Sequence, residues 1–223
     1  MPLPDDLSPR ELAPYLDHTV LAPAATLEDV ARACAEARDH GFAGVCVRAS
    51  FVAEVRRRLA GTAVRAIAVV DFPAGEATTE VRVAEARAAV AAGAEELDVV
   101  APLPAILAGR WAAAHEDLRA VVRAAAVPVK VILETGRLDA DRKVASAAIS
   151  AAAGAAFVKT STGFGFGGAT PEDVALLRAV VGPGVGVKAS GGVRTAEDAR
   201  RMLRAGASRV GTSNGVGIST PPH

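Results

Sequence analysis

Lysine is rare in this chain, and the few positions that keep it suggest covalent chemistry. The 223 residues carry 25 basic side chains, but only four of these are lysines. Lys130, Lys159 and Lys188 each lie inside an apolar run, and burial lowers the pKa of an amine. A buried amine that is neutral near pH 7, because a second cation lies beside it, can attack a carbonyl and form a Schiff base. A long stem that reaches solvent, or a structural ion pair, is the alternative. Lys143 lies in a polar helix start, where we expect it to be solvated.

Acidic residues on neighbouring segments could move protons for such an amine. Asp98 alternates with Leu and Val neighbours, so its side chain is expected on the opposite face of a strand. Lys159 and Lys188 alternate with valines in the same way. If the valines pack outward, the polar side chains point inward together. Asp17 and Glu134 are further acids that could transfer protons or balance charge. A buried lysine–aspartate network that only fixes strand register is the alternative.

Three glycine-rich turns follow late apolar runs, at residues 162–168, 190–194 and 211–215. Backbone N–H groups in such turns bind anions, especially beside a helix start. The second turn also contains Arg194. In barrels of alternating strands and helices, the loops after strands seven and eight recur as a phosphate site. The turns therefore predict phosphate binding, with plain tight turns as the alternative. The first turn lacks the acidic partner of a dinucleotide-binding motif.

A repeated junction organises the elements that must position these groups. Four alanine-rich stretches each end in a glycine, the usual helix stop, and a short β-type run follows. These glycines are Gly41, Gly93, Gly154 and Gly206. Eight strands are expected near residues 16–21, 44–48, 64–72, 96–101, 129–135, 156–162, 184–190 and 209–213. Polar N-cap residues open helices between them, at Thr26, Thr79, Asp139, Thr170 and Thr195.

Strict alternation of strand and helix predicts a parallel sheet, and eight repeats favour a closed barrel. We therefore expect an α/β chain that forms a single (β/α)8 TIM-barrel domain over residues 1–223, with a short N-terminal extension. In this fold, polar groups near the carboxyl ends of the strands carry the chemistry.

Composition and missing motifs exclude several other functions. The 25 basic and 25 acidic residues argue against a nucleic-acid or anionic-membrane partner. No secretory signal or membrane-length apolar stretch is visible, so a cytoplasmic protein is expected. The four histidines have no metal-ligand spacing. Cys46, between two valines, is expected in the core.

The two lysine motifs and their companions closely resemble those of deoxyribose-phosphate aldolases. The likeness extends from about residue 12 to residue 215, and it includes the segments 158–163, 167–173, 187–195, 16–19, 96–100 and 130–135. The resemblance implies an aldolase without metal or cofactor that cleaves 2-deoxy-D-ribose 5-phosphate to acetaldehyde and glyceraldehyde 3-phosphate. It assigns the Schiff base to Lys159, a choice that strand parity leaves open.

The resemblance also implies roles for the neighbouring residues. Lys188 would lower the pKa of the nucleophile and relay protons with Asp98, and Asp17 would pair with Lys188. The implied phosphate-binding residues are Gly163, Gly191, Gly192, Arg194, Gly211 and Ser213. A homodimer is expected for an enzyme of this type.

Three positions depart from the family pattern: Asn214 replaces a common serine, Ala49 replaces a proline, and the tail after Gly217 is short. We expect a curtailed last helix.

Two alternative functions remain. The first is another Schiff-base sugar-phosphate aldolase, with a different acceptor pocket, and the second is a non-catalytic phosphosugar-binding barrel. The second would need one of the lysines or Asp98 to be missing, and none is.

Overall fold

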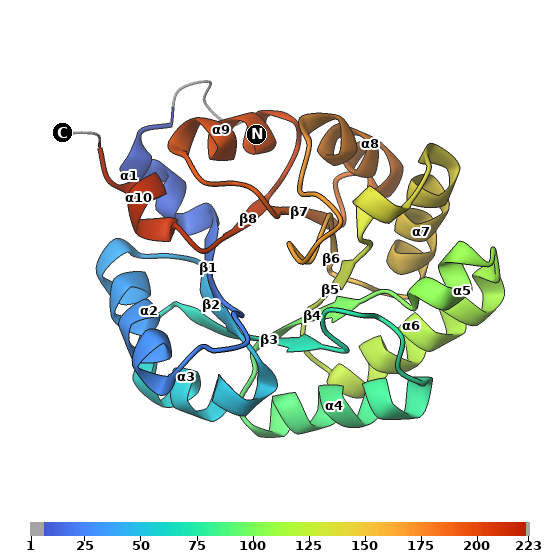
Figure 1. The fold of residues 1–223 in the computed structure, drawn as a ribbon, viewed down its shortest axis with the longest axis horizontal. Coiled ribbons are helices and arrows are strands. Elements are labelled where there is room, and N and C mark those ends of the chain that lie inside the picture. Colours follow the sequence, from blue (N-terminus) through green and yellow to red (C-terminus); the bar gives the residue numbers. More distant parts are fainter. Residues whose placement is uncertain (1–6, 222–223) are drawn as a thin grey trace.

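A closed ring of parallel strands, surrounded by helices, forms the body of the molecule (Figure 1). The computed structural model describes residues 7–221. Within them the strands are β1 (Leu16–Val20), β2 (Gly44–Val47), β3 (Arg65–Val70), β4 (Glu96–Val100), β5 (Val129–Ile132), β6 (Phe157–Lys159), β7 (Gly186–Ser190) and β8 (Arg209–Thr212). Each strand pairs in parallel with the next along the chain, and β8 pairs with β1. The predicted (β/α)8 barrel is confirmed.

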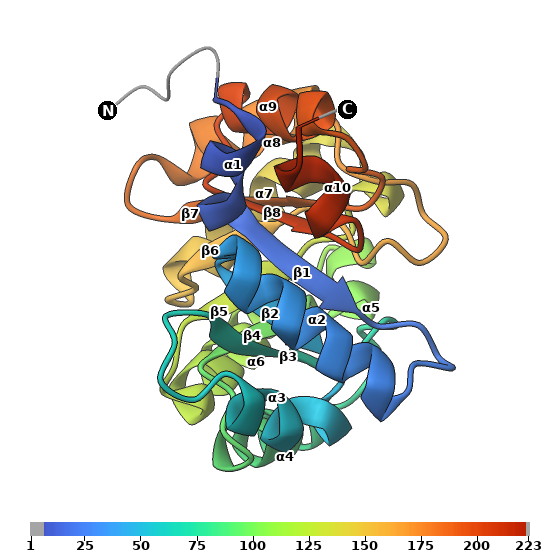
Figure 2. The same cartoon turned by 90° about the vertical axis from the view of Figure 1, so that its left-hand side faces the viewer.

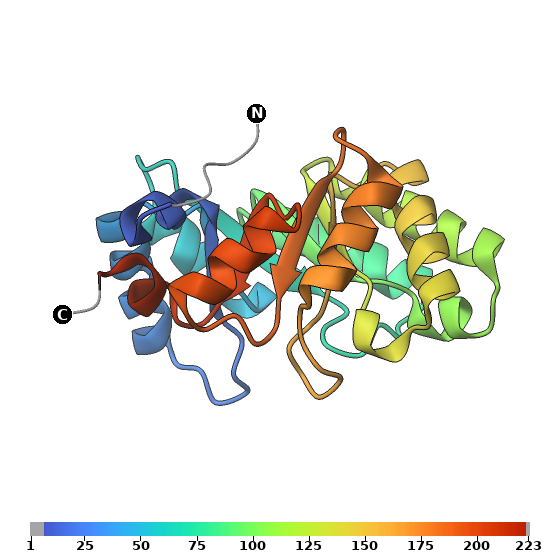
Figure 3. The same ribbon diagram turned by 90° about the horizontal axis from the view of Figure 1, so that it is seen from above.

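Helices follow the strands and form the outer layer (Figures 1 and 3). They are α2 (Leu27–His40), α3 (Val52–Arg58), α4 (Thr79–Ala91), α5 (Leu103–Leu107), α6 (Trp111–Ala125), α7 (Ala140–Ala152), α8 (Pro171–Val181), α9 (Ala196–Arg204) and α10 (Gly215–Ser219). Short 3-10 helices precede or follow some of them: η1 (Ala13–Tyr15), η2 (Ala49–Phe51) and η3 (Thr135–Arg137).

Side-chain hydrogen bonds cap the helices where the sequence indicates. The side chains of Thr26, Asp139, Thr170 and Thr195 each accept a hydrogen bond from the backbone N–H three residues on. These bonds satisfy donors that have no partner in the first helical turn. The expected cap at Thr79 is displaced by one residue. Thr78 caps α4 instead, and the hydroxyl of Thr79 donates to Asp117 of α6 at 2.7 Å.

Successive side chains along each strand alternate between the face packed against the helices and the face inside the barrel. Val45, Val99, Val131 and Val187 are fully buried in the main core, where the strands pack against the helices. The opposite face of β2 and β3 places Cys46, with Ile67 and Val69, in a smaller apolar cluster. The prediction that Cys46 is a core residue is confirmed.

Helix α1 (Pro9–Leu12) precedes β1 and contacts both α9 and α10. Figure 2 shows α1 and α10 side by side at one edge of the barrel. The last helix, α10, has only five residues, as the short tail predicts. None of the helices within residues 7–221 is long and apolar enough to cross a bilayer.

Several strands are shorter than expected. Strand β6 ends at Lys159 rather than near residue 162, and β5 ends at Ile132 rather than near residue 135. The polar residues beyond these strands bond to neighbouring segments of the chain. For example, the Thr160 hydroxyl donates to the carbonyl of Ser190 at 3.0 Å.

Candidate active site

Asp98, on β4, lies at the centre of a group of buried lysines. Its Oδ2 atom accepts hydrogen bonds from Nζ of Lys159 on β6 and Nζ of Lys188 on β7, each at 2.8 Å. Its Oδ1 atom accepts one from Nζ of Lys130 on β5 at 3.0 Å. The barrel register produces this convergence, because Asp98 pairs with Lys130 across β4 and β5, and Lys159 pairs with Lys188 across β6 and β7. The inward orientation predicted for Asp98, Lys159 and Lys188 is confirmed.

Further ion pairs extend this group across the barrel. Asp17 of β1 accepts from Lys188 at 2.6 Å and from Arg209 at 2.7 Å. Glu96 of β4 lies 2.5 Å from Nζ of Lys130 and 3.7 Å from the Arg209 guanidinium. We call the whole set the ion cluster, and its members are Asp17, Glu96, Asp98, Lys130, Lys159, Lys188 and Arg209.

The electrostatics of the ion cluster keep its central groups charged. Burial raises the pKa of Asp98, but the three lysines lower it by more, and the resulting pKa lies well below the ordinary value. Burial likewise raises the pKa of Asp17, and Lys188, Lys130 and Arg209 lower it below its ordinary value. Burial lowers the pKa of Lys188, but the charges of Asp17 and Asp98 raise it by more, so that the pKa lies above the ordinary value of a lysine. Lys188 is therefore an ammonium group near neutral pH.

The neighbouring thiol stays protonated. Burial raises the pKa of Cys46 to about 11, and the nearby Asp98 charge adds to this effect. Its sulfur lies 3.9 Å from Oδ2 of Asp98.

A cavity of about 770 Å³ opens beside the ion cluster. Lys159 is the only member of the cluster that lines it, whereas the side chains of Lys188, Lys130 and Asp98 are fully buried. The β1–α2 segment and the loops after β6, β7 and β8 form the walls, and in Figure 3 the first two project from the same end of the barrel. That end carries the carboxyl termini of the strands, where this fold has its chemistry.

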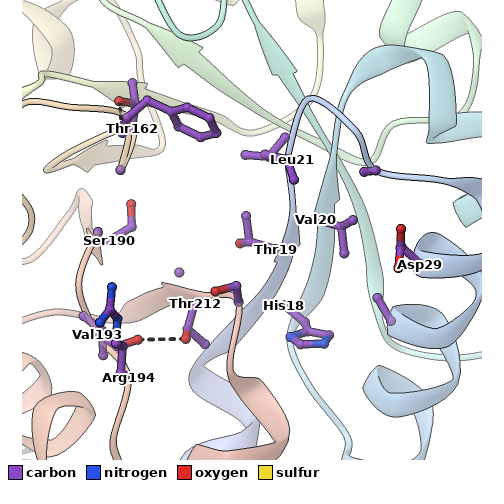
Figure 4. A pocket seen from close by; sticks show the side chains of 18 of the residues that line it. His18, Thr19, Val20, Leu21, Asp29, Thr162, Ser190, Val193, Arg194 and Thr212 are labelled. Carbon is purple, nitrogen blue, oxygen red and sulfur yellow. Dashed lines mark hydrogen bonds between the residues drawn. The ribbon is translucent and has the colours of Figure 1, made fainter.

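All the residues predicted to bind phosphate line this cavity, namely Gly163, Gly191, Gly192, Arg194, Gly211 and Ser213. The end of β8 is tied to the loop after β7, because the Thr212 hydroxyl donates to the carbonyl of Val193 at 2.8 Å (Figure 4). Gly191 must be glycine: its φ is +89°, and a Cβ atom would lie 2.9 Å from Cα of Gly168. Asn214 does not line the cavity, and its amide donates to the carbonyl of Arg194 at 2.8 Å.

The opposite wall holds residues that sequence analysis did not select as site residues. His18, Thr19 and Val20 of β1 lie across the cavity from Ser190 and Arg194 in Figure 4. Nε2 of His18 lies 2.7 Å from a carboxylate oxygen of Glu36 on α2. Within residues 7–221, no group of three or more His, Cys, Asp or Glu side chains is arranged to hold a metal ion.

The structure corrects two expectations and adds three residues. Glu134 does not join the ion cluster, because its carboxylate accepts hydrogen bonds from the backbone and the hydroxyl of Thr162. Lys143 is not solvated: it is partly buried and pairs with Asp173 at 2.6 Å.

The additions are Lys130, Glu96 and Arg209, whose places in the ion cluster were not predicted. Strand parity could have found Glu96, since it lies two residues before Asp98 on the same face. Nothing in the sequence pairs Arg209 with Asp17, which is separated from it by almost the whole chain.

The fold is an eight-stranded α/β barrel, in which three buried lysines contact a central aspartate and one of their amines opens to a cavity. This arrangement is typical of enzymes that form a Schiff base between a lysine and a carbonyl substrate. Residues 12–220 match the family model described as DeoC/LacD family aldolase. The chain belongs to this family of aldolases.

Relatives and solved structures agree with this assignment. A deoxyribose-phosphate aldolase of Brevibacillus brevis is 50% identical over 207 residues, which cover 92% of this chain and 94% of the relative. One of Thermotoga maritima is 46% identical, covering 97% of this chain and 88% of the relative. The structure of deoxyribose phosphate aldolase from Aeropyrum pernix, described as a tetramer, superposes with a TM-score of 0.88 at 37% identity, covering 95% of this chain and 91% of that one.

Proposed function

We propose that this aldolase reversibly cleaves 2-deoxy-D-ribose 5-phosphate to D-glyceraldehyde 3-phosphate and acetaldehyde through a Schiff base on Lys159. One observation carries the assignment of the nucleophile: Lys159 is the amine of the ion cluster that lines the cavity. Lys188 shares Oδ2 of Asp98 with it, but is fully buried and bonded to two carboxylates.

The reaction follows from this arrangement. Nζ of Lys159 attacks the C1 carbonyl of the open-chain sugar to form a carbinolamine. Its hydroxyl takes up a proton and leaves as water, which gives a protonated imine. The electron pair of the C2–C3 bond moves toward the imine while the C3 hydroxyl loses its proton, which releases glyceraldehyde 3-phosphate. An enamine remains on Lys159. Protonation at C2 and hydrolysis then release acetaldehyde and restore the amine.

We assign the proton transfers to Lys188 and Asp98, which lie beside Lys159. The positive charge of Lys188 at rest disfavours a second ammonium group next to it, and this favours the neutral, nucleophilic form of Lys159. Asp17 holds Lys188 in place at 2.6 Å.

The phosphate is assigned to the glycine-rich side of the same cavity, with Gly163, Gly191, Gly192, Arg194, Gly211 and Ser213 as its binding residues. Backbone N–H groups near the start of α9, together with a guanidinium, favour a doubly charged anion. Binding energy from the phosphate can then be used at the carbonyl, which is the other end of the substrate.

Turnover with purified protein tests the function. Incubation with 2-deoxyribose 5-phosphate should yield equimolar acetaldehyde and glyceraldehyde 3-phosphate. Cleavage of another sugar phosphate, but not of this one, would favour a different aldolase on the same barrel. Phosphosugar binding with no cleavage of any sugar phosphate would favour the non-catalytic barrel.

Assembly and location belong to the same proposal. We propose a homodimer, which light scattering can distinguish from a monomer or from a tetramer like that described for the A. pernix protein. We also propose a cytoplasmic location, for which the small phosphorylated substrate is the supporting argument.

A further inference from the structure

The charges of the ion cluster do not balance. Among the described residues, its ion pairs join four basic groups to three carboxylates. An unpaired charge in a buried site is costly, and a titratable group can remove that cost by losing a proton. The cluster therefore favours the state in which one of its basic groups is neutral.

The contacts identify which group that is. Lys188 contacts Asp17 and Asp98, Lys130 contacts Glu96 and Asp98, and Arg209 contacts Asp17 and Glu96. Each of these three cations thus has two carboxylate partners. Lys159 has one, Asp98, which it shares with two other lysines.

Lys130 contributes one of the four positive charges without touching the substrate site. It does not line the cavity, and its side chain is fully buried. Its ammonium lies between Glu96, at 2.5 Å, and Oδ1 of Asp98, at 3.0 Å. The contact occupies one oxygen of Asp98, and the other oxygen remains for Lys159 and Lys188.

We propose that Lys130 is a positioning residue that makes Lys159 the group of the ion cluster that gives up its proton. Lys130 acts in two ways: it adds the fourth positive charge, and it fixes the orientation of the Asp98 carboxylate. Glu96 opposes it, because it neutralises part of that charge. This inference rests on the proposed function of Lys159 as the nucleophile.

Other charged and titratable groups lie near Lys159. Arg194 is a further cation of the same cavity lining, but it is exposed, so solvent screens its charge. Cys46 of β2 keeps its proton, since burial raises its pKa to about 11. Glu134, after β5, accepts hydrogen bonds from Thr162. Across the cavity, His18 pairs with Glu36, and Asp29 with Arg32. Asp17 and Arg209 belong to the cluster and are already counted.

The test uses three variants: Lys130→Met, Glu96→Gln and the double substitution. The readout is reductive methylation of Lys159 by formaldehyde and cyanoborohydride, measured against pH by peptide mass spectrometry. This reaction needs the neutral amine but no sugar, so it reports the proton on Lys159 even if the natural substrate has been assigned wrongly. Turnover of 2-deoxyribose 5-phosphate by wild type tests the proposed function separately.

The count of charges in each variant predicts whether the pH midpoint of Lys159 methylation rises or falls. Lys130→Met leaves three basic groups and three carboxylates, so Lys159 should keep its proton and the methylation midpoint should rise by about one pH unit or more. Glu96→Gln increases the excess, and the midpoint should fall. The double variant has the same excess as wild type, and its midpoint should return close to the wild-type value.

A merely structural role would give a different pattern. Loss of packing would reduce turnover at every pH and leave the midpoint unchanged, which would overturn the proposal. A double variant that stays at the midpoint of Lys130→Met would overturn it as well. If Lys130→Met does not fold, as judged by circular dichroism, the remaining comparison decides: the midpoint of Glu96→Gln must lie below that of the double variant. Equal midpoints would contradict the inference.

Discussion

At the scale of single residues, Asp98 determines what each substitution in the ion cluster does. It accepts hydrogen bonds from three lysines, so removing one lysine changes the contacts available to the others. Removing the carboxylate itself leaves three lysine side chains without their shared acceptor. Variants of Lys188 and Asp98 should therefore fail in different ways.

Lys188→Leu should slow imine formation near neutral pH. The substitution removes the cation beside Lys159, so Lys159 should hold its proton to higher pH. Borohydride trapping of the imine should be slow near pH 7 and recover as the pH is raised. Trapping at the wild-type rate at every pH would contradict the tuning role of Lys188.

Asp98→Asn should separate imine formation from turnover. The amide cannot relay protons as the carboxylate does, so kcat should fall by a factor of about 10² or more. Neutral Lys159 should still form the imine, because the excess of positive charge increases. Trapping and steady-state turnover, measured on the same preparation, check this. Equal losses in both would indicate that Asp98 mainly supports the fold.

At the scale of elements, the loops after β6, β7 and β8 should determine the preference for a phosphorylated substrate. Gly192 has a φ of +79°, and a Cβ atom there would meet no heavy atom within 4 Å. A side chain at this position would strain the backbone and occupy the cavity wall.

Gly192→Val should therefore reduce kcat/KM for 2-deoxyribose 5-phosphate far more than for 2-deoxyribose. Gly61→Val is a matched control, because Gly61 has a φ of +80° and similar open space but lies between α3 and β3, outside the cavity lining. The control should have the same strain and affect both substrates equally. Equal losses in Gly192→Val would move the anion site elsewhere.

Local sequence patterns predict most of the helices and strands, because the formation of these elements depends mainly on residues close together in the sequence. The alternation of Asp98 with apolar neighbours identifies its inward face, and the glycine stops and polar caps identify the helices. The details that fail depend on partners distant in the sequence. Thr79 looks like a cap, but its hydroxyl bonds Asp117 of α6. Glu134 follows a strand as a catalytic acid could, yet the left-handed backbone at this residue, with φ of +56°, and the bonds to Thr162 assign it to a loop.

The site follows the same division between local and distant information. Resemblance to the aldolase family selects Lys159 over Lys188 as the nucleophile, whereas strand parity alone cannot choose between them. The places of Lys130, Glu96 and Arg209 in the ion cluster were not predicted. The Arg209–Asp17 pair, for example, forms only when β8 pairs with β1.

At the scale of the whole molecule, the buried ion cluster should shape the dependence of stability on pH. The pKa values of Asp17 and Asp98 are lowered on folding, so their contribution is complete above the unfolded carboxyl pKa of about 4. It is lost as the pH falls through the folded values. The pKa of Lys188 is raised, so its contribution is complete below the unfolded lysine pKa of about 10.4 and is lost as the pH rises through the folded value.

We therefore expect the free energy of unfolding to fall on the acid side, and to begin to fall above about pH 10, in denaturant titrations from about pH 2 to 11. Asp98→Asn should flatten the acid side, because asparagine does not titrate. An acid side as steep as in wild type would contradict the role of Asp98. We also propose that residues 1–223 form one domain, for which fluorescence and circular dichroism should give a single coincident transition.

The most direct test of the account is to trap the imine with borohydride in the presence of 2-deoxyribose 5-phosphate and to map the modified residue. The account predicts modification at Lys159 in wild type, and none in Lys159→Met or Lys159→Arg while both variants remain folded. Arginine should fail as completely as methionine, because a guanidinium stays protonated and cannot attack a carbonyl. Modification mapped to Lys188, or a Lys159→Met variant that still traps and turns over the substrate, would contradict the account.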